Sequence, residues 1–161
     1  SLRIIPAYNV RSIAQPVRHV VEQAILLWQE DHYADVYFTT GGYSEPMAQQ
    51  AAGEYFKQTL DIYVPKDTPE VAYLVSQLTG VPVILIYTDG NGYTKLVGSI
   101  QAPLLLSSDL NTGDESQDKN GHKLTFRAES VHKAYFYSAQ DGIPPPQKMY
   151  SKGFSLGFLQ L

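Results

Sequence analysis

The stretch that comes nearest to a catalytic motif is Gly-Phe-Ser-Leu-Gly at residues 153–157. Its spacing matches the turn that exposes a nucleophilic serine at the end of a strand. That chemistry needs a strand, a turn and a helix around the serine, and a histidine base later in the chain. The last histidine is His132, which precedes Ser155. We therefore expect no catalytic serine here and no enzyme activity.

Metal ligation is the second chemistry that the sequence could support. The chain has four histidines, and none lies at a ligand spacing such as His-Glu-x-x-His: His19, His32, His122 and His132. The acidic segment 109–120 has the composition of a calcium loop. However, an EF-hand needs Gly at its sixth position and Glu at its twelfth, where this chain has Asp114 and Asn120. The pattern predicts a solvated loop, with no metal and no cofactor.

Composition narrows the function classes further. The chain has 12 Lys and Arg against 16 Asp and Glu, a net charge of −4, and its basic residues are scattered. A basic face for sequence-specific nucleic-acid binding is therefore not expected. No apolar run approaches the roughly 18–20 residues of a membrane helix. The absence of cysteine excludes disulfides and weakly favours a reducing compartment. The sequence begins at Ser1 and not at a methionine, so it is compatible with a processed N-terminus.

The elements that must position any site are clearest between residues 68 and 100. Thr68 and Pro69 form a helix start, and apolar residues at helical spacing predict a helix over residues 69–79 that Gly80 ends. Residues 82–88 are apolar on both faces, which predicts a central strand covered on both sides. Asp-Gly-Asn-Gly at 89–92 predicts a hairpin turn into a return strand at 93–100.

Other segments give weaker patterns. Residues 17–28 fit a helix face or a buried strand, and β-favouring residues favour a strand at roughly 23–29. The expected strands are residues 35–40, closed by two glycines, and then 55–64, 103–106, 122–129 and 132–137. Residues 43–53 and 107–121 are polar or small and are expected to be loops. Residues 154–158 alternate in polarity and predict a strand that pairs within its own chain or with a neighbour.

These elements predict an α+β, mostly β fold. We expect an antiparallel sandwich or barrel of about eight strands with one flanking helix at 69–79. Residues 1–141 are expected to form a single domain. Residues 142–161 begin with a Pro-rich spacer and are expected to end as a C-terminal arm or strand.

One pattern is more specific than a generic β domain. It consists of Asp-Gly-Asn-Gly-Tyr-Thr-Lys-Leu-Val-Gly at 89–98, Ala-Pro-Leu at 102–104, Thr-Gly at 112–113, Asn-Gly-His-Lys-Leu-Thr-Phe at 120–126 and His-Lys-Ala-Tyr-Phe-Tyr at 132–137. This pattern resembles structural proteins of bacteriophage or prophage tail modules of the Bacteroides type. The resemblance covers roughly residues 53–137 and implies a tail-tube-like fold.

The resemblance implies a non-enzymatic, tail-associated protein that assembles into rings or a tube. Its partners would be copies of itself and other tail proteins, with no membrane and no sequence-specific nucleic acid. It would be located in the virion, or in the bacterial cytoplasm during assembly. The candidate assembly elements are the acidic loop at 107–121, the loop at 43–53 and the C-terminal segment at 150–161. The candidate residues singled out within them are Asp109, Asn111, Asp114, Glu115, Asp118, Tyr150, Phe154, Leu156 and Phe158. The alternative is a monomeric, Tyr-rich β-sandwich that binds a carbohydrate or another small ligand.

Overall fold

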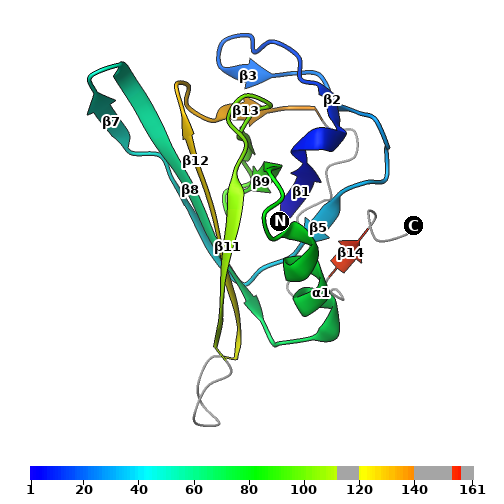
Figure 1. Cartoon of the computed structure of the whole chain (residues 1–161). Coiled ribbons are helices and arrows are strands. Elements are labelled where there is room, and N and C mark those ends of the chain that lie inside the picture. Colours follow the sequence, from blue (N-terminus) through cyan, green and yellow to red (C-terminus); the bar gives the residue numbers. More distant parts are fainter. Residues whose placement is uncertain (112–119, 140–153, 157–161) are drawn as a thin grey trace.

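The computed structural model of this protein describes residues 1–111, 120–139 and 154–156. In these residues the fold is mostly β, with one α-helix (Figure 1). The strands are β1 (Leu2–Pro6), β2 (Val10–Ser12), β3 (Val20–Val21), β4 (Leu26–Leu27), β5 (Ala34–Val36), β6 (Thr40–Ser44), β7 (Met47–Gln50), β8 (Gly53–Pro65), β9 (Val83–Thr88), β10 (Thr94–Val97), β11 (Leu105–Asn111), β12 (Gly121–Ser130), β13 (Tyr135–Tyr137) and β14 (Phe154–Leu156). The helix is α1 (Pro69–Leu78), and a 3-10 turn spans Ala7–Asn9.

The strands form two main sheets. The seven-stranded sheet has the order β14-β5-β1-β9-β10-β13-β3, and the five-stranded sheet has the order β11-β12-β8-β6, with β7 also paired to β8. A third, two-stranded sheet joins β2 and β4. Neither main sheet closes on itself within the described residues, so the sandwich, rather than the barrel, describes this fold. The strands outnumber the roughly eight expected because several have only two to four residues.

Helix α1 and strand β9 have the positions and environments that their patterns predict. The Thr68 hydroxyl accepts a hydrogen bond from the Val71 N–H and caps the helix, and Gly80 has a φ of 74° just beyond the helix end. All six residues of β9 are buried. The hairpin after β9 is held by the Asp89 carboxylate, which accepts hydrogen bonds from the N–H groups of Asn91 and Tyr93.

Strand β9 is covered on both faces because the seven-stranded sheet has a core on each side. On the first side, side chains of β1, β5 and β9 pack against β8, β12 and the buried stripe of α1. On the other side, a smaller core that includes Ile84, Ile86 and Leu96 packs under the N-terminal segment of residues 7–27. The five-stranded sheet instead alternates, with Leu60, Ile62 and Phe126 in the core and polar residues facing outward.

Two predicted loops are largely strands. Residues 43–53 were expected to be a loop, but β6 runs to Ser44 and β7 spans Met47–Gln50, both paired with β8. Gly41 and Gly42 lie inside β6 and do not close a strand. The sequence does not reveal β6 and β7 as strands, because most of their residues are exposed on both faces and no apolar alternation marks them. Similarly, β11 continues through Asn111, and residues 112–119 lie outside the described part.

The ambiguous segment 17–28 contains no helix. It holds the short strands β3 and β4, so the strand at roughly 23–29 is reduced to Leu26–Leu27. Both strands are short. β3 pairs only through Val20 and Val21, and β4 pairs with β2 at a point where the register shifts. The segment serves mainly as the cover of the smaller core.

Candidate functional site

The predicted assembly residues lie at separate places in the fold. Asp109 is exposed on β11 opposite Lys123, and Asn111 is the last residue of β11. Phe154 and Leu156 belong to β14, which pairs with β5 of the same chain. The structure therefore does not bring the β11 and β14 groups together, because they are at the edges of different sheets. The remaining candidates lie outside the described residues: Asp114, Glu115, Asp118, Tyr150 and Phe158.

The five-stranded sheet has an open edge on each side. Within the described residues, β11 pairs only with β12, and both β6 and β7 pair only with β8. The outward backbone groups of such edge strands are free to pair with another chain. Leu105 and Leu110 on β11 are also about half exposed, at 52% and 51%. These two edges are therefore candidate surfaces for strand pairing with another chain.

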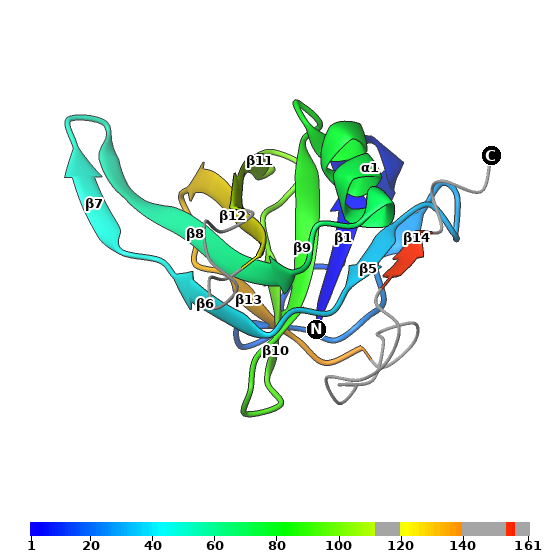
Figure 2. The same cartoon turned by 90° about the horizontal axis from the view of Figure 1, so that it is seen from below.

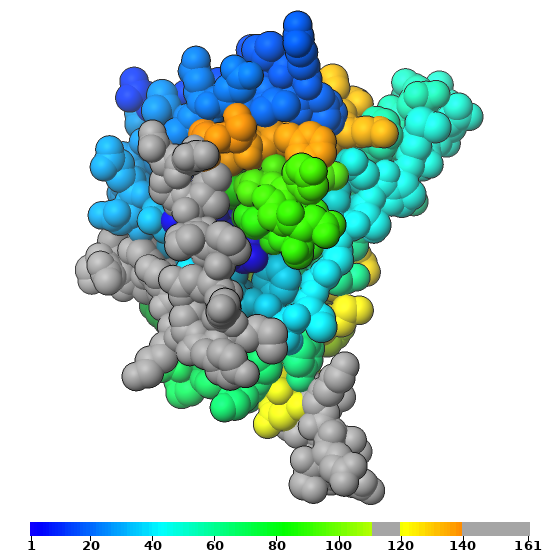
Figure 3. All heavy atoms as spheres, turned by 180° about the vertical axis from the view of Figure 1, so that it is seen from behind, coloured from blue at the N-terminus to red at the C-terminus, as the bar shows by residue number. Residues whose placement is uncertain are grey.

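The hairpin of β7 and β8 extends beyond the body of the domain. Figures 1 and 2 show its tip standing away from both sheets, and Figure 3 shows it as a separate projection from behind. Its residues Met47, Gln49, Gln50 and Glu54 are exposed, Met47 by 56%. An isolated hairpin gains little stability by itself in water. A projecting hairpin with an exposed methionine is therefore a candidate contact surface.

Tyr43 and Glu45 connect the five-stranded sheet to the residue that precedes β13. The Tyr43 hydroxyl, on β6, donates to the Glu45 carboxylate at 3.0 Å, and the same carboxylate oxygen accepts from the Ala134 N–H at 2.9 Å. The Lys95 ammonium lies 5.3 Å from the Tyr43 ring centroid and 5.2 Å from that of Phe136. Burial, followed by the nearby Glu45 charge, raises the pKa of Tyr43 far above its ordinary value. The phenol is therefore held neutral as a structural donor.

We expect alkaline unfolding to report on Tyr43. Because the folded-state pKa is raised, its contribution to stability is complete below the ordinary pKa of about 10 and is lost as the pH rises above it. The free energy of unfolding should fall above that pH, and it should fall less steeply in Tyr43→Phe. Urea unfolding on both sides of that pH measures the two slopes. Equal slopes would show that Tyr43 is not responsible.

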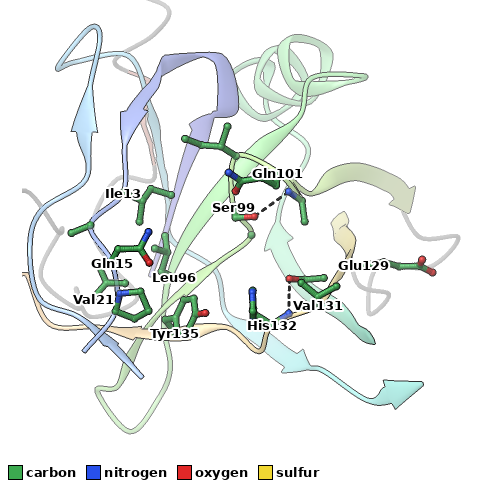
Figure 4. Close-up of a pocket in the computed structure, with 16 residues that line it drawn as sticks. Ile13, Gln15, Val21, Leu96, Ser99, Gln101, Glu129, Val131, His132 and Tyr135 are labelled. Atoms are coloured by element: carbon green, nitrogen blue, oxygen red, sulfur yellow. Dashed lines mark hydrogen bonds between the residues drawn. The ribbon is translucent and has the colours of Figure 1, made fainter. Parts of the chain in front are cut away.

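A hollow lies over the smaller core, where two chain connections meet the end of β12. Residues 13–16, 98–102 and 129–132 surround a pocket of about 560 Å³, and Val21, Leu96 and Tyr135 complete its wall (Figure 4). Most of these side chains are apolar. The polar members are Gln15, Ser99, Gln101, Glu129, Ser130 and His132. A mostly apolar hollow with a few convergent polar groups is the usual form of a small-molecule site.

The loops of this pocket are held by their own hydrogen bonds. The Ser99 hydroxyl accepts from the Ala102 N–H at 3.0 Å, and the Ser130 hydroxyl accepts from the His132 N–H at 3.2 Å. Gly98 has a φ of 87°, and a Cβ there would lie 2.5 Å from a methyl carbon of Leu104. Only glycine suits both conditions. The rim of the pocket is therefore fixed by sequence-specific turns.

Two histidine rings lie near Tyr135 in the wall of the pocket. The Tyr135 ring centroid is 4.9 Å from that of His19 and 6.3 Å from that of His132. His19 also donates to the Ala134 carbonyl at 3.0 Å. Arg18 and His19 have φ values of 51° and 68°, in a turn where Val17 and Val20 exchange backbone hydrogen bonds. Such a turn favours Asn-Gly, so Arg-His is strained here, and the His19 contacts help to hold it.

The histidines form no metal site in the described residues. His122 is buried and pairs with Asp67 at 2.9 Å, whereas His132 lies beyond the other end of β12. Across the described ranges no cluster of three or more His, Asp or Glu side chains could hold a metal ion. Among the same residues, no helix has the length and apolar character to cross a bilayer.

Sequence reasoning missed the pocket and the exposed aromatic residues near β4. Trp28 is 67% exposed and Tyr8 66%, and Asn9 fixes their loop by bonding to the backbone of Gln29 and His32. The pocket residues come from three segments far apart in the chain, so no spacing marks them. The sequence offers one indication in this region, because a glycine inside a strand pattern, such as Gly98 in the strand expected at 93–100, marks a bulge or a close backbone approach.

Comparison with protein families, with curated proteins and with solved structures found no match for this chain.

Proposed function

We propose that this chain is a non-enzymatic structural subunit associated with a bacteriophage or prophage tail, and that it assembles with copies of itself into rings or a tube. The observation that carries the proposal is the pair of open edges on the five-stranded sheet, β11 on one side and β6 with β7 on the other. The strand and turn pattern of the sequence supports the tail-module context. Other tail proteins would be its further partners, in the virion or in the bacterial cytoplasm during assembly.

Two different edges favour head-to-tail contacts between copies. If β11 of one copy pairs with β6 or β7 of the next, each copy still has one free edge to offer. Contacts of this heterologous kind close into rings or continue as open filaments, depending on the rotation between copies. Main-chain hydrogen bonds would supply the affinity in such edge pairing, and side chains the specificity.

The outward face of the five-stranded sheet fits a solvated wall better than a second protein core. Its cross-strand neighbours are polar, with Asp109 opposite Lys123, Lys57 opposite Glu129, and the Thr125 hydroxyl bonded to Asp61. Opposite charges facing each other across strands stabilise the sheet and leave no strongly basic face. In a closed ring this face would be exposed to water and would not bind nucleic acid tightly.

The first test is solution mass by light scattering over a wide protein concentration range, with negative-stain images of the most concentrated sample. We expect the mass to rise with concentration and the images to show rings or tubes, because edge pairing depends on mass action. A mass that stays at that of one chain at every concentration would contradict the proposal.

A second candidate function is a monomeric binding module for a small ligand. It is favoured by the pocket of about 560 Å³ between residues 13–16, 98–102 and 129–132. A strict monomer in the scattering experiment would make this candidate the leading one.

A further inference from the structure

We propose that the pocket between residues 13–16, 98–102 and 129–132 binds an uncharged polyhydroxyl ligand, with the chemistry of one neutral sugar residue. This inference does not depend on whether the chain assembles, because every lining residue belongs to a single copy.

The size of the pocket suits such a ligand. Its volume of about 560 Å³ is in the roughly 300–1,000 Å³ range of pockets for drug-sized ligands, so it has ample room for one sugar residue. Ile13, Val21 and Leu96 supply an apolar wall, and Tyr135 adds an aromatic ring (Figure 4). A sugar ring presents one apolar face to such a wall and hydroxyl groups around its rim.

The charges around the pocket argue against an ionic ligand. Among the described residues that line it there is no lysine or arginine, so a carboxylate or phosphate would find no cation there except a protonated histidine. The lining residue that carries a carboxylate is Glu129, which is exposed and points away from the other labelled side chains in Figure 4. An ionic ligand would therefore lose its hydration without gaining a charged partner.

The polar groups match a ligand that both donates and accepts hydrogen bonds. The side-chain amides of Gln15 and Gln101 make no hydrogen bond within the described part of the chain, and each offers two donors and one acceptor. Ser99 and Ser130 accept backbone N–H groups, which leaves each hydroxyl hydrogen available for donation. Hydroxyl groups of a sugar can use both kinds of partner.

The pocket is also held in place before any ligand arrives. The Ser99 turn and Gly98 fix one rim, and the buried Gln58 side chain donates to the His132 carbonyl and supports the opposite rim. On the remaining side, the strained Arg18-His19 turn positions His19 against Tyr135. A preorganised site loses less entropy on binding, so even a small neutral ligand can be retained.

The test uses the full chain and a panel of neutral monosaccharides, namely glucose, galactose, mannose and N-acetylglucosamine, with galacturonate as the charged comparison. Saturation-transfer NMR at millimolar sugar should show contact with at least one neutral member, and titration should give its Kd. The double variant Gln15→Ala/Gln101→Ala should weaken that Kd by about tenfold, because it removes two hydrogen-bonding amides from the pocket. The matched control, Gln49→Ala/Gln50→Ala on the exposed β7–β8 hairpin, should leave the Kd unchanged.

Three outcomes would overturn the inference. They are the absence of transfer to any neutral sugar, an equal loss of affinity in the hairpin control, and tighter binding of galacturonate than of the neutral sugars. Circular dichroism of both double variants shows whether each remains folded, which is expected because all four glutamines are exposed.

Discussion

Replacing Asp35 by alanine is expected to lower the free energy of unfolding by about 3–5 kcal/mol. Asp35 on β5 faces Arg3 on β1, and both oxygens of its carboxylate accept from the guanidinium, at 2.7 and 2.9 Å. The two side chains are only 8% and 11% exposed. Tyr33 covers the guanidinium, whose carbon lies 3.9 Å from its ring centroid. Removing the carboxylate would leave a charge that is largely cut off from water.

Urea unfolding of the two proteins measures this effect. Asp31→Ala is the matched control, since Asp31 is exposed, and surface substitutions usually change stability by no more than about 0.5 kcal/mol. The double variant Arg3→Met/Asp35→Leu should recover most of the loss, because an apolar pair of similar size needs no charge compensation. A loss below about 1 kcal/mol in Asp35→Ala would mean that the pair behaves like a surface ion pair.

Shortening the β7–β8 hairpin is expected to abolish assembly and leave the domain folded. The variant replaces residues 47–56 with Asn-Gly, which joins Pro46 to Lys57. These two residues already face each other, since the Lys57 N–H donates to the Pro46 carbonyl at 3.0 Å, and Asn-Gly forms the tight turn that such a hairpin needs. The change removes β7 and the projecting end of β8, but keeps the buried residues from Gln58 onward.

Light scattering at the concentrations where the wild type assembles checks this prediction. We expect the variant to keep the mass of one chain, with a far-UV spectrum and an unfolding midpoint close to the wild type. Tyr73→Ser is the control for loss of exposed apolar surface elsewhere, because Tyr73 on α1 is 49% exposed. Assembly that persists in the shortened variant would exclude the hairpin as the contact surface.

Several elements could be predicted from the sequence because their signals are local. Thr68 and Pro69 begin α1 as expected, and Asp89 holds the turn after β9. The apolar run at 83–88 also indicated correctly that its strand is buried on both faces. In each case the deciding interactions join residues close in the chain, or concern the hydrophobicity of one short segment.

The features that bear on function depend on contacts between segments far apart in the chain. β7 is a strand because β8 offers it a backbone partner, although its exposed side chains carry no alternation. The residues of the pocket meet only when two connections and the end of β12 converge over the smaller core. Arg3 and Asp35 likewise become a buried pair only through the register of β1 and β5. Local patterns were enough to predict the mostly β class, the capped helix and the central hairpin, whereas pairing between distant segments produced the edges, the projecting hairpin and the pocket. Such long-range pairing leaves no periodic signal in the chain, because it depends on which free backbone edges and side chains the rest of the fold provides.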